Sequence, residues 1–168
     1  MELVLGVVCD DARTTPDGKL DVEGMFNDLY APGFPAKQDR MVLVLVVEWD
    51  RDDHGRFQFR VDLNGPDGRP SLTVDGHTEV DRRPPDRPPA RTRLIMPLEE
   101  VIFPRPGPYR FEARMKGRTF PGPTLHLVER DAPPTPEGPE SEPGSRGQED
   151  RRGRVRSGHP GEDREHGG

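Results

Sequence analysis

Apolar and polar residues alternate with a period of two along most of the first 131 residues, and this alternation predicts β-strands. The clearest alternating run covers residues 57–63, and a second run of the same kind covers residues 109–115. Shorter runs occupy residues 20–26, with a bulge expected at Gly24, and residues 72–78. Because successive side chains of a strand point to opposite faces, each run predicts a strand with one buried face and one wet face.

Two further segments are apolar at consecutive positions. Residues 3–9 and 41–47 lack the alternation, which predicts strands buried on both faces, the second of them central in its sheet. Valine recurs in the second segment, and its β-branched side chain favours a strand over a helix. No segment carries a capped helical pattern, and residues 98–103 are expected to form one helical turn at most.

Clusters of proline, glycine, asparagine and aspartate separate these runs at intervals of about ten residues. Residues 16–19, 64–68 and 116–118 are each predicted to close a hairpin. Residues 81–90 contain four prolines and are expected to form an extended, polyproline-type loop that crosses between sheets. About seven to eight short strands at this spacing indicate an all-β fold, an antiparallel β-sandwich, with a small β-barrel as the alternative.

Composition divides the chain into a domain and a tail. Apolar residues make up 30% of the 168 residues, against about 45–50% in typical globular domains. The deficit is concentrated in residues 132–168, whose only apolar members are Ala132 and Val155 and which include six prolines and eight glycines. Such a segment cannot bury enough apolar surface to offset the entropy of ordering its backbone. We therefore predict a β-sandwich domain over residues 1–131 and a disordered, charged tail over residues 132–168.

The tail contains one basic cluster, which bears on nucleic-acid binding. It consists of Arg151, Arg152, Arg154 and Arg156. Four phosphate contacts, opposed by flanking carboxylates and without an aromatic ring for base stacking, give little affinity, so no nucleic-acid partner is expected. The chain has 22 Arg and 3 Lys, a bias typical of a GC-rich bacterial genome.

Three observations concern the cellular compartment. No segment approaches the ~18 consecutive apolar residues of a membrane-spanning helix, so no membrane span is expected. The first nine residues lack the positive charges of an export signal and carry Glu2 instead. The single cysteine, Cys9, excludes an internal disulfide framework and a multi-cysteine zinc site. Together these features predict a cytoplasmic protein.

Three segments carry a resemblance to a known family. Residues 9–13 are Cys-Asp-Asp-Ala-Arg, residues 18–24 are Gly-Lys-Leu-Asp-Val-Glu-Gly, and residues 103–111 are Phe-Pro-Arg-Pro-Gly-Pro-Tyr-Arg-Phe. Over residues 3–128 the chain resembles a family of small bacterial proteins of unknown function that open with Cys-Asp-Asp-x-Arg and then Gly-Lys-x-x-x-x-Gly. The resemblance implies a β-sandwich and brings no catalytic or ligand-binding residues with it. The Pro/Arg loop and the charged tail depart from the compact core expected of that family.

The sequence offers little for catalysis. Ser71 is the only serine of the first 131 residues, and it starts a strand instead of occupying a glycine-flanked nucleophile turn. Burial and the neighbouring Asp10 and Asp11 are expected to raise the pKa of the Cys9 thiol, which disfavours an attacking thiolate. No glycine-rich phosphate loop is present. We therefore expect no enzymatic activity and no cofactor.

The candidate metal ligands are Asp50, Asp52, Asp53 and His54. Residues 50–55 resemble the start of an EF-hand loop, but position twelve is Val61 instead of a bidentate glutamate, which excludes an EF-hand. Calcium binding at a sandwich edge stays open if a second loop supplies carboxylates, and a zinc site requires His54 to meet His77 or His126 in space. The alternative is an ordinary Asp/Gly turn without metal.

Asp10, Asp11 and Arg13 are candidates for fixing a turn or binding a ligand. Two adjacent carboxylates after a strand point one toward each face of the sheet. We expect one of them to pair with Arg13 or to accept backbone N–H bonds that fix the turn toward Thr14 and Thr15.

These features favour a non-catalytic binding or accessory module that contacts a protein partner through an edge strand or a loop cluster. The alternative is a metal-dependent, calcium-like surface binder or enzyme that uses residues 50–54. The sequence indicates neither the oligomeric state nor the identity of a partner.

Overall fold

The computed structural model describes residues 1–130, which form ten β-strands and no helix. In chain order the strands are β1 (Glu2–Cys9), β2 (Asp11–Thr14), β3 (Leu20–Glu23), β4 (Asp28–Ala31), β5 (Ala36–Glu48), β6 (Gly55–Asn64), β7 (Pro70–Val80), β8 (Arg91–Phe103), β9 (Gly107–Met115) and β10 (Arg118–Glu129). In this part of the chain no helix is long and apolar enough to cross a membrane. The predicted tail, residues 132–168, and its arginine cluster lie outside the described residues.

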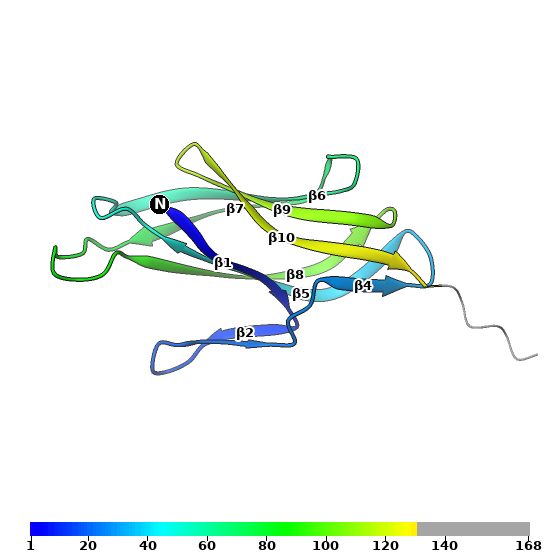
Figure 1. The fold of residues 1–168 in the computed structure, drawn as a ribbon, viewed down its shortest axis with the longest axis horizontal. Helices are drawn as coiled ribbons and strands as arrows, with labels where there is room; N and C mark the ends of the chain where they lie inside the picture. The colour runs from blue at the N-terminus through cyan, green and yellow to red at the C-terminus, as the bar shows by residue number, and fades with distance from the viewer. Residues whose placement is uncertain (131–168) are drawn as a thin grey trace, which may run out of the picture. The chain divides into compact units, whose positions relative to one another are not determined.

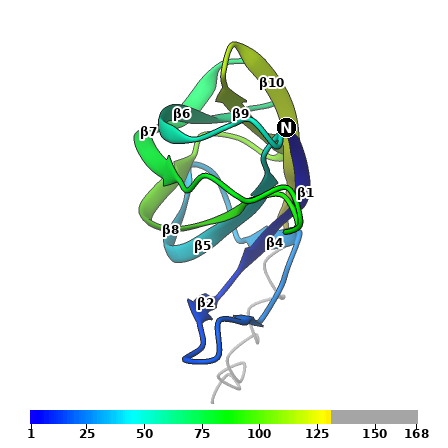
Figure 2. The same cartoon turned by 90° about the vertical axis from the view of Figure 1, so that its left-hand side faces the viewer.

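The strands form three sheets, which Figure 1 shows. One sheet has the order β1-β5-β8, a second has the order β4-β10-β9-β6-β7, and β2 pairs with β3 alone. All neighbours are antiparallel except β4 and β10, which are parallel. The two larger sheets pack on a shared core, and contacts of β1 with β10 and of β7 with β8 give a barrel-like closure (Figure 2). The all-β sandwich is confirmed, with more strands than expected.

The main core lies between the two larger sheets. Leu43 of β5, Leu63 of β6 and Leu125 of β10 are completely buried in it. The ring of Phe103 packs edge-on against that of Tyr109, with 4.9 Å between the ring centroids. Full burial of one such side chain stabilises the fold by about 1.5–3 kcal/mol, so these contacts hold the two sheets together.

A second, smaller core explains why residues 41–47 are apolar on both faces. They belong to β5, the central strand of its sheet, and all of them are buried, as predicted. The β2–β3 hairpin covers the outer face of this sheet, where Val42 and Val44 pack with Cys9. The tip of the hairpin is attached to β8 because the carbonyl oxygen of Gly18 accepts a hydrogen bond from Arg93 Nη1 at 2.6 Å.

The expectation that residues 3–9 are buried on both faces is wrong for the first half of the segment. β1 is an edge strand, and Val4 and Leu5 are 41% and 38% exposed. The β2–β3 hairpin covers only the end of β1 near Cys9, and the register of β1 against β5 shifts between Leu3 and Leu5. This irregularity leaves Val4 as an extra residue without a partner in β5.

The helical turn expected at residues 98–103 is also wrong, because these residues belong to β8. Leu98 and Val101 are both buried, although an uninterrupted alternation would place them on opposite faces. Glu100 lies between them with a φ of 53°, and the alternation of buried and exposed positions along β8 shifts by one residue there. The resulting three-residue spacing of buried positions imitates a helical pattern.

Turns were predicted more accurately than strand ends. Residues 16–19, 64–68 and 116–118 close the β2–β3, β6–β7 and β9–β10 hairpins, as expected. The loop at residues 81–90 crosses from the five-stranded to the three-stranded sheet, also as expected. It is not extended throughout, because Arg87 N donates to the carbonyl oxygen of Pro84 in a turn, at 3.0 Å. The side chain of Arg51 donates to the carbonyl oxygens of Pro85 and Arg87, which supports this turn.

Candidate functional site

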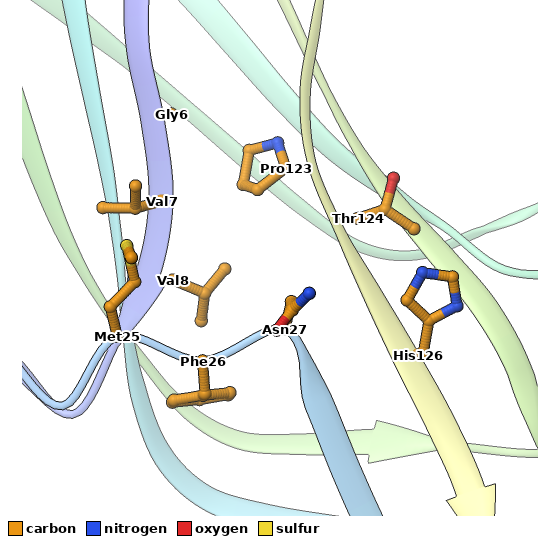
Figure 3. A pocket seen from close by; sticks show the side chains of 9 residues that line it. All are labelled: Gly6, Val7, Val8, Met25, Phe26, Asn27, Pro123, Thr124 and His126. Atoms are coloured by element: carbon orange, nitrogen blue, oxygen red, sulfur yellow. The ribbon is translucent and has the colours of Figure 1, made fainter.

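A pocket of about 440 Å³ lies where β1 and β10 diverge (Figure 3). Residues 6–8 of β1 form one side of it, and Pro123, Thr124 and His126 of β10 form the other. The segment 25–27, which connects β3 to β4, forms the third side. We call this site the β1–β10 pocket.

Backbone contacts between distant parts of the chain close the pocket at one end. Phe26 N donates to the carbonyl oxygen of Val8 at 3.0 Å, and His126 N donates to that of Asn27 at 2.7 Å. Segment 25–27 therefore bridges β1 and β10. At the other end Pro123 packs under Gly6, where an added Cβ atom would lie 3.1 Å from Pro123 Cδ.

The turn that leads into segment 25–27 depends on Asp10 and Gly24. Asp10 N donates to the carbonyl oxygens of Glu23 and Gly24, at 3.1 and 3.2 Å. Gly24 has a φ of 63°, a conformation that strongly favours glycine. The carboxylate of Asp10 packs against Gly24 so closely that a Cβ atom on residue 24 would overlap it. The two residues therefore set the path by which the chain reaches Met25.

Apolar side chains from all three sides of the pocket form part of its lining. They are Val8, Phe26 and Pro123, and Met25 stands at the rim with 69% of its surface exposed. Met25 has the largest exposed fraction among the large hydrophobic residues of the described chain. Val4 and Leu5 of the same β1 edge are also exposed. An apolar surface of this kind beside a hollow is typical of a contact site.

Three lining residues have polar side chains. They are Asn27, which precedes β4, and Thr124 and His126 of β10 (Figure 3). Among residues 1–130 no lysine, arginine, aspartate or glutamate lines the pocket. The arrangement is suited to hydrogen bonding of a neutral group.

Main-chain groups of Gly6 and Thr124 at the pocket have no strand partner on one side among residues 1–130. Val8 directs its carbonyl group away from β5, toward Phe26. Gly6, two residues earlier, directs its N–H and carbonyl groups to that same side, where the described residues provide no paired strand. On β10, His126 N donates to the carbonyl oxygen of Asn27, on the side away from β9. Thr124, two residues earlier, directs its main-chain groups to the same side, but the pairing of β10 with β4 begins only at His126. Gly6 and Thr124 therefore present main-chain groups along the pocket.

The structure places the three candidates Asp10, Asp11 and Arg13 in different contacts. Asp10 packs on Gly24, as described above. Asp11 Oδ1 accepts a hydrogen bond from Arg40 Nη2 at 3.1 Å, and Arg13 pairs with Asp21 across the β2–β3 ladder. Arg13 is thus not paired with either neighbouring aspartate, and none of the three lines the β1–β10 pocket.

Cys9 is completely buried, and its Sγ lies 3.6 Å from the carbonyl oxygen of Val42, to which it donates. Burial raises the pKa of the Cys9 thiol, and the charges of Asp10 and Asp11 raise it further. A buried thiol of raised pKa packs as a small apolar side chain.

Cations already bind two of the four candidate metal ligands in the 50–54 loop. The carboxylate of Asp50 pairs with the amino group of Met1, and Asp53 Oδ1 pairs with Lys116 Nζ at 2.5 Å. The hydrogen bond from the Met1 amino group lowers the pKa of Asp50. His54 Nδ1 lies 2.9 Å from the carbonyl oxygen of Asp52. Among residues 1–130 no group of three or more His, Cys, Asp or Glu side chains is placed to hold a metal ion.

The Asp62 carboxylate, on the outer face of the five-stranded sheet, is buried, which the sequence pattern does not predict. Asp62 alternates with apolar neighbours, and this predicts a solvent-exposed position, yet its side chain is only 4% exposed. Thr73 Oγ1 donates to Asp62 Oδ1 at 2.6 Å, and Arg60 and Arg114 approach the carboxylate at 3.2 and 3.5 Å. Burial alone would raise the pKa of Asp62, but the hydrogen bonds from Thr73 and Arg60 and the nearby guanidinium charges lower it overall.

Arg60 and Arg114 stand opposite each other on β6 and β9, and Asp62 stands opposite Glu112. Like charges in such positions repel, but Arg114 pairs with both Asp62 and Glu112. The four residues compensate one another, and this network therefore stabilises the sheet.

Comparison with protein families adds one finding. A model for a family of unknown function, DUF6941, matches residues 4–126, well over half of the chain. The chain belongs to DUF6941. All residues that line the β1–β10 pocket lie within this match, so the pocket is part of the DUF6941 domain. The resemblance to a family of unknown function over residues 3–128 is thus confirmed. A search of curated proteins gave no match.

The β1–β10 pocket itself was not predicted, because it is assembled from three segments far apart in the sequence. The sequence does contain local signals of it. Gly6 interrupts an apolar strand, Met25 and Phe26 follow a glycine between polar residues, and residues 121–123 are Pro-Gly-Pro inside a strand. Proline inside a strand marks an edge, where its missing N–H costs no ladder bond.

Proposed function

We propose that the DUF6941 domain is a non-catalytic binding module that docks a protein partner on the surface around the β1–β10 pocket. Met25 carries the proposal, because its apolar side chain is 69% exposed at the rim of a 440 Å³ hollow. Unbranched methionine side chains adapt to the shape of a partner, and exposed apolar side chains beside a hollow mark interaction sites. The proposed compartment is the cytoplasm, which keeps the free thiol of Cys9 reduced.

The composition of the pocket supports binding over catalysis. Within the described residues, the lining contains one imidazole, that of His126, and no carboxylate or thiol beside it. Binding of a partner needs only apolar area and hydrogen-bonding groups at the rim, both of which the pocket has. No observation favours the metal-dependent alternative.

A peptide selection tests the proposal. The full 168-residue chain is immobilised and a display library of short random peptides is selected on it. Enriched peptides are then measured against three proteins: the unchanged chain, Met25→Asp and Ile102→Asp. Ile102 is a matched control, because it is an apolar strand residue with 56% exposure that lies outside the pocket lining.

We expect the enriched peptides to bind Ile102→Asp with the same affinity as the unchanged chain. We expect them to bind Met25→Asp at least about tenfold more weakly. A charge introduced at the rim opposes the burial of an apolar side chain there, which accounts for a loss of this size. If no peptide is enriched, or if the enriched peptides bind Met25→Asp without loss, the proposal is wrong. Equal loss for both variants points to another surface and also contradicts it.

A further inference from the structure

We infer that the β1–β10 pocket takes an extended, uncharged peptide segment, with one apolar side chain inserted against Val8, Phe26 and Pro123 and its peptide groups hydrogen-bonded to the pocket walls. This inference rests on the proposed function and specifies the chemistry of the partner. Three observations support it, namely the charge of the lining, the free main-chain groups and the size of the pocket.

The lining favours an uncharged ligand over a charged one. A buried ionic group needs a counter-charge or several strong hydrogen bonds, because transfer of an unpaired charge out of water is very costly. The part of the chain that the structure describes provides no Lys, Arg, Asp or Glu side chain there to neutralise a phosphate, a carboxylate or an ammonium group. The apolar lining residues favour an aliphatic or aromatic group, and the polar ones favour a neutral donor or acceptor.

The free main-chain groups indicate that this neutral group is a peptide unit. Gly6 and Thr124 stand on opposite sides of the pocket, and each directs an N–H and a carbonyl group to the side that lacks a strand partner among the described residues. An N–H donor beside a carbonyl acceptor is the pattern that an extended peptide matches with its own backbone. The chain itself uses this pattern one step further along β1, where Phe26 forms an antiparallel bridge with Val8.

The size of the pocket suits it to a single side chain. Its 440 Å³ is at the small end of the ~300–1,000 Å³ that ligand pockets usually occupy. Side chains next to the inserted one would lie along the exposed Val4, Leu5 and Met25.

The test uses one peptide from the selection described above, in three forms, and the full chain. In the first form the apolar anchor is replaced by Asp. In the second, the backbone amides are N-methylated one at a time, which removes a donor and leaves the side chains unchanged. The unmodified peptide is the reference.

We expect the anchor replacement to abolish measurable binding. We also expect N-methylation to weaken binding about tenfold at alternate amides and to have little effect at the amides between them, because alternate groups of an extended chain face the same edge. Suppose that the peptide binds Met25→Asp more weakly than the unchanged chain, while its own affinity is unaffected by the Asp anchor and by every N-methyl group. That result would contradict this inference but not the proposed function. Failure of the selection, or equal binding to Met25→Asp, overturns both.

Discussion

The carboxylate of Asp10 packs directly against Gly24, in the space that a side chain on residue 24 would occupy. The contact joins the end of β1 to the turn after β3, and Asp10 N also donates to the carbonyl oxygens of Glu23 and Gly24, where that turn begins. Segment 25–27 follows at once and forms one side of the β1–β10 pocket. Asp10 and Gly24 thus connect the family-like motifs of the sequence to the shape of the candidate site.

Gly24→Ala should destabilise the fold strongly. The substitution forces a left-handed φ on a residue with a side chain, which costs about 1–2 kcal/mol, and it adds an overlap with Asp10. We expect a total loss of about 2–4 kcal/mol in the free energy of unfolding, measured by urea denaturation.

Gly18→Ala is the matched control, because Gly18 also has a positive φ, of 77°, but nothing lies within 4 Å of its would-be Cβ atom. Its loss should be limited to the conformational cost of about 1–2 kcal/mol. Equal losses for the two variants would show that the contact between Asp10 and Gly24 contributes nothing.

Asp62→Asn should lower the free energy of unfolding by about 1–3 kcal/mol at pH 7. The change leaves Arg60 and Arg114, which stand opposite each other, without their shared counter-charge. These arginines are about half exposed, so solvent reduces the loss below that of a fully buried pair. Asp86→Asn in the exposed 81–90 loop is the control, with an expected change within about 0.5 kcal/mol.

The stabilisation by Asp62 should also depend on pH. Since the pKa of Asp62 is lowered in the folded protein, its carboxylate stabilises the fold at pH values above the pKa of the unfolded chain, near 3.8. This contribution is lost as the pH falls through the folded pKa. Denaturation curves of the unchanged chain and of Asp62→Asn should therefore converge below about pH 4. A difference that stays constant from pH 7 to pH 3 would contradict the assignment.

Met25→Ala should change the free energy of unfolding by less than about 0.5 kcal/mol, because most of the side chain is in water. Met41→Ala, at a position with no exposure, should cost about 2–5 kcal/mol under the same conditions. If Met25→Ala destabilises the fold as much as Met41→Ala does, Met25 has a structural role, and the observation behind the proposed function is lost.

Calcium, zinc and manganese should not raise the melting temperature. A bound ion would stabilise the folded state, but in the 50–54 loop Asp50 and Asp53 already pair with the Met1 amino group and with Lys116. A rise with one ion that disappears in Asp52→Asn would contradict this prediction and restore the metal hypothesis. Lys116→Met tests the reason, because it frees Asp53 without removing a carboxylate.

The strands that sequence analysis predicts best are those whose alternation is uninterrupted and whose ends are marked by turn residues. Residues 57–63 lie in β6 and residues 109–115 lie in β9, as expected. β8 was missed because the irregularity at Glu100 shifts its pattern, and β4 was missed because four residues are too few to show a period.

The candidate site was less accessible to sequence analysis than the strands were. The alternation of residues 57–63 shows that Asp62 lies between two buried residues. It does not show that Arg60 and Arg114 cover the Asp62 carboxylate. The β1–β10 pocket depends on contacts between residues more than a hundred positions apart, such as Gly6 and Pro123. Local patterns contain no information on which distant edges meet.

The central claim is that a partner binds between β1 and β10, and backbone amide NMR of the full chain tests it most directly. A peptide from the selection is titrated into the labelled protein. The account predicts that the signals of Gly6, Met25, Asn27 and Thr124 shift together, while those of Ile102 and of residues around Asp62 do not move. Shifts that cluster on the free edge of β7, or on the outer face around Asp62, would contradict it.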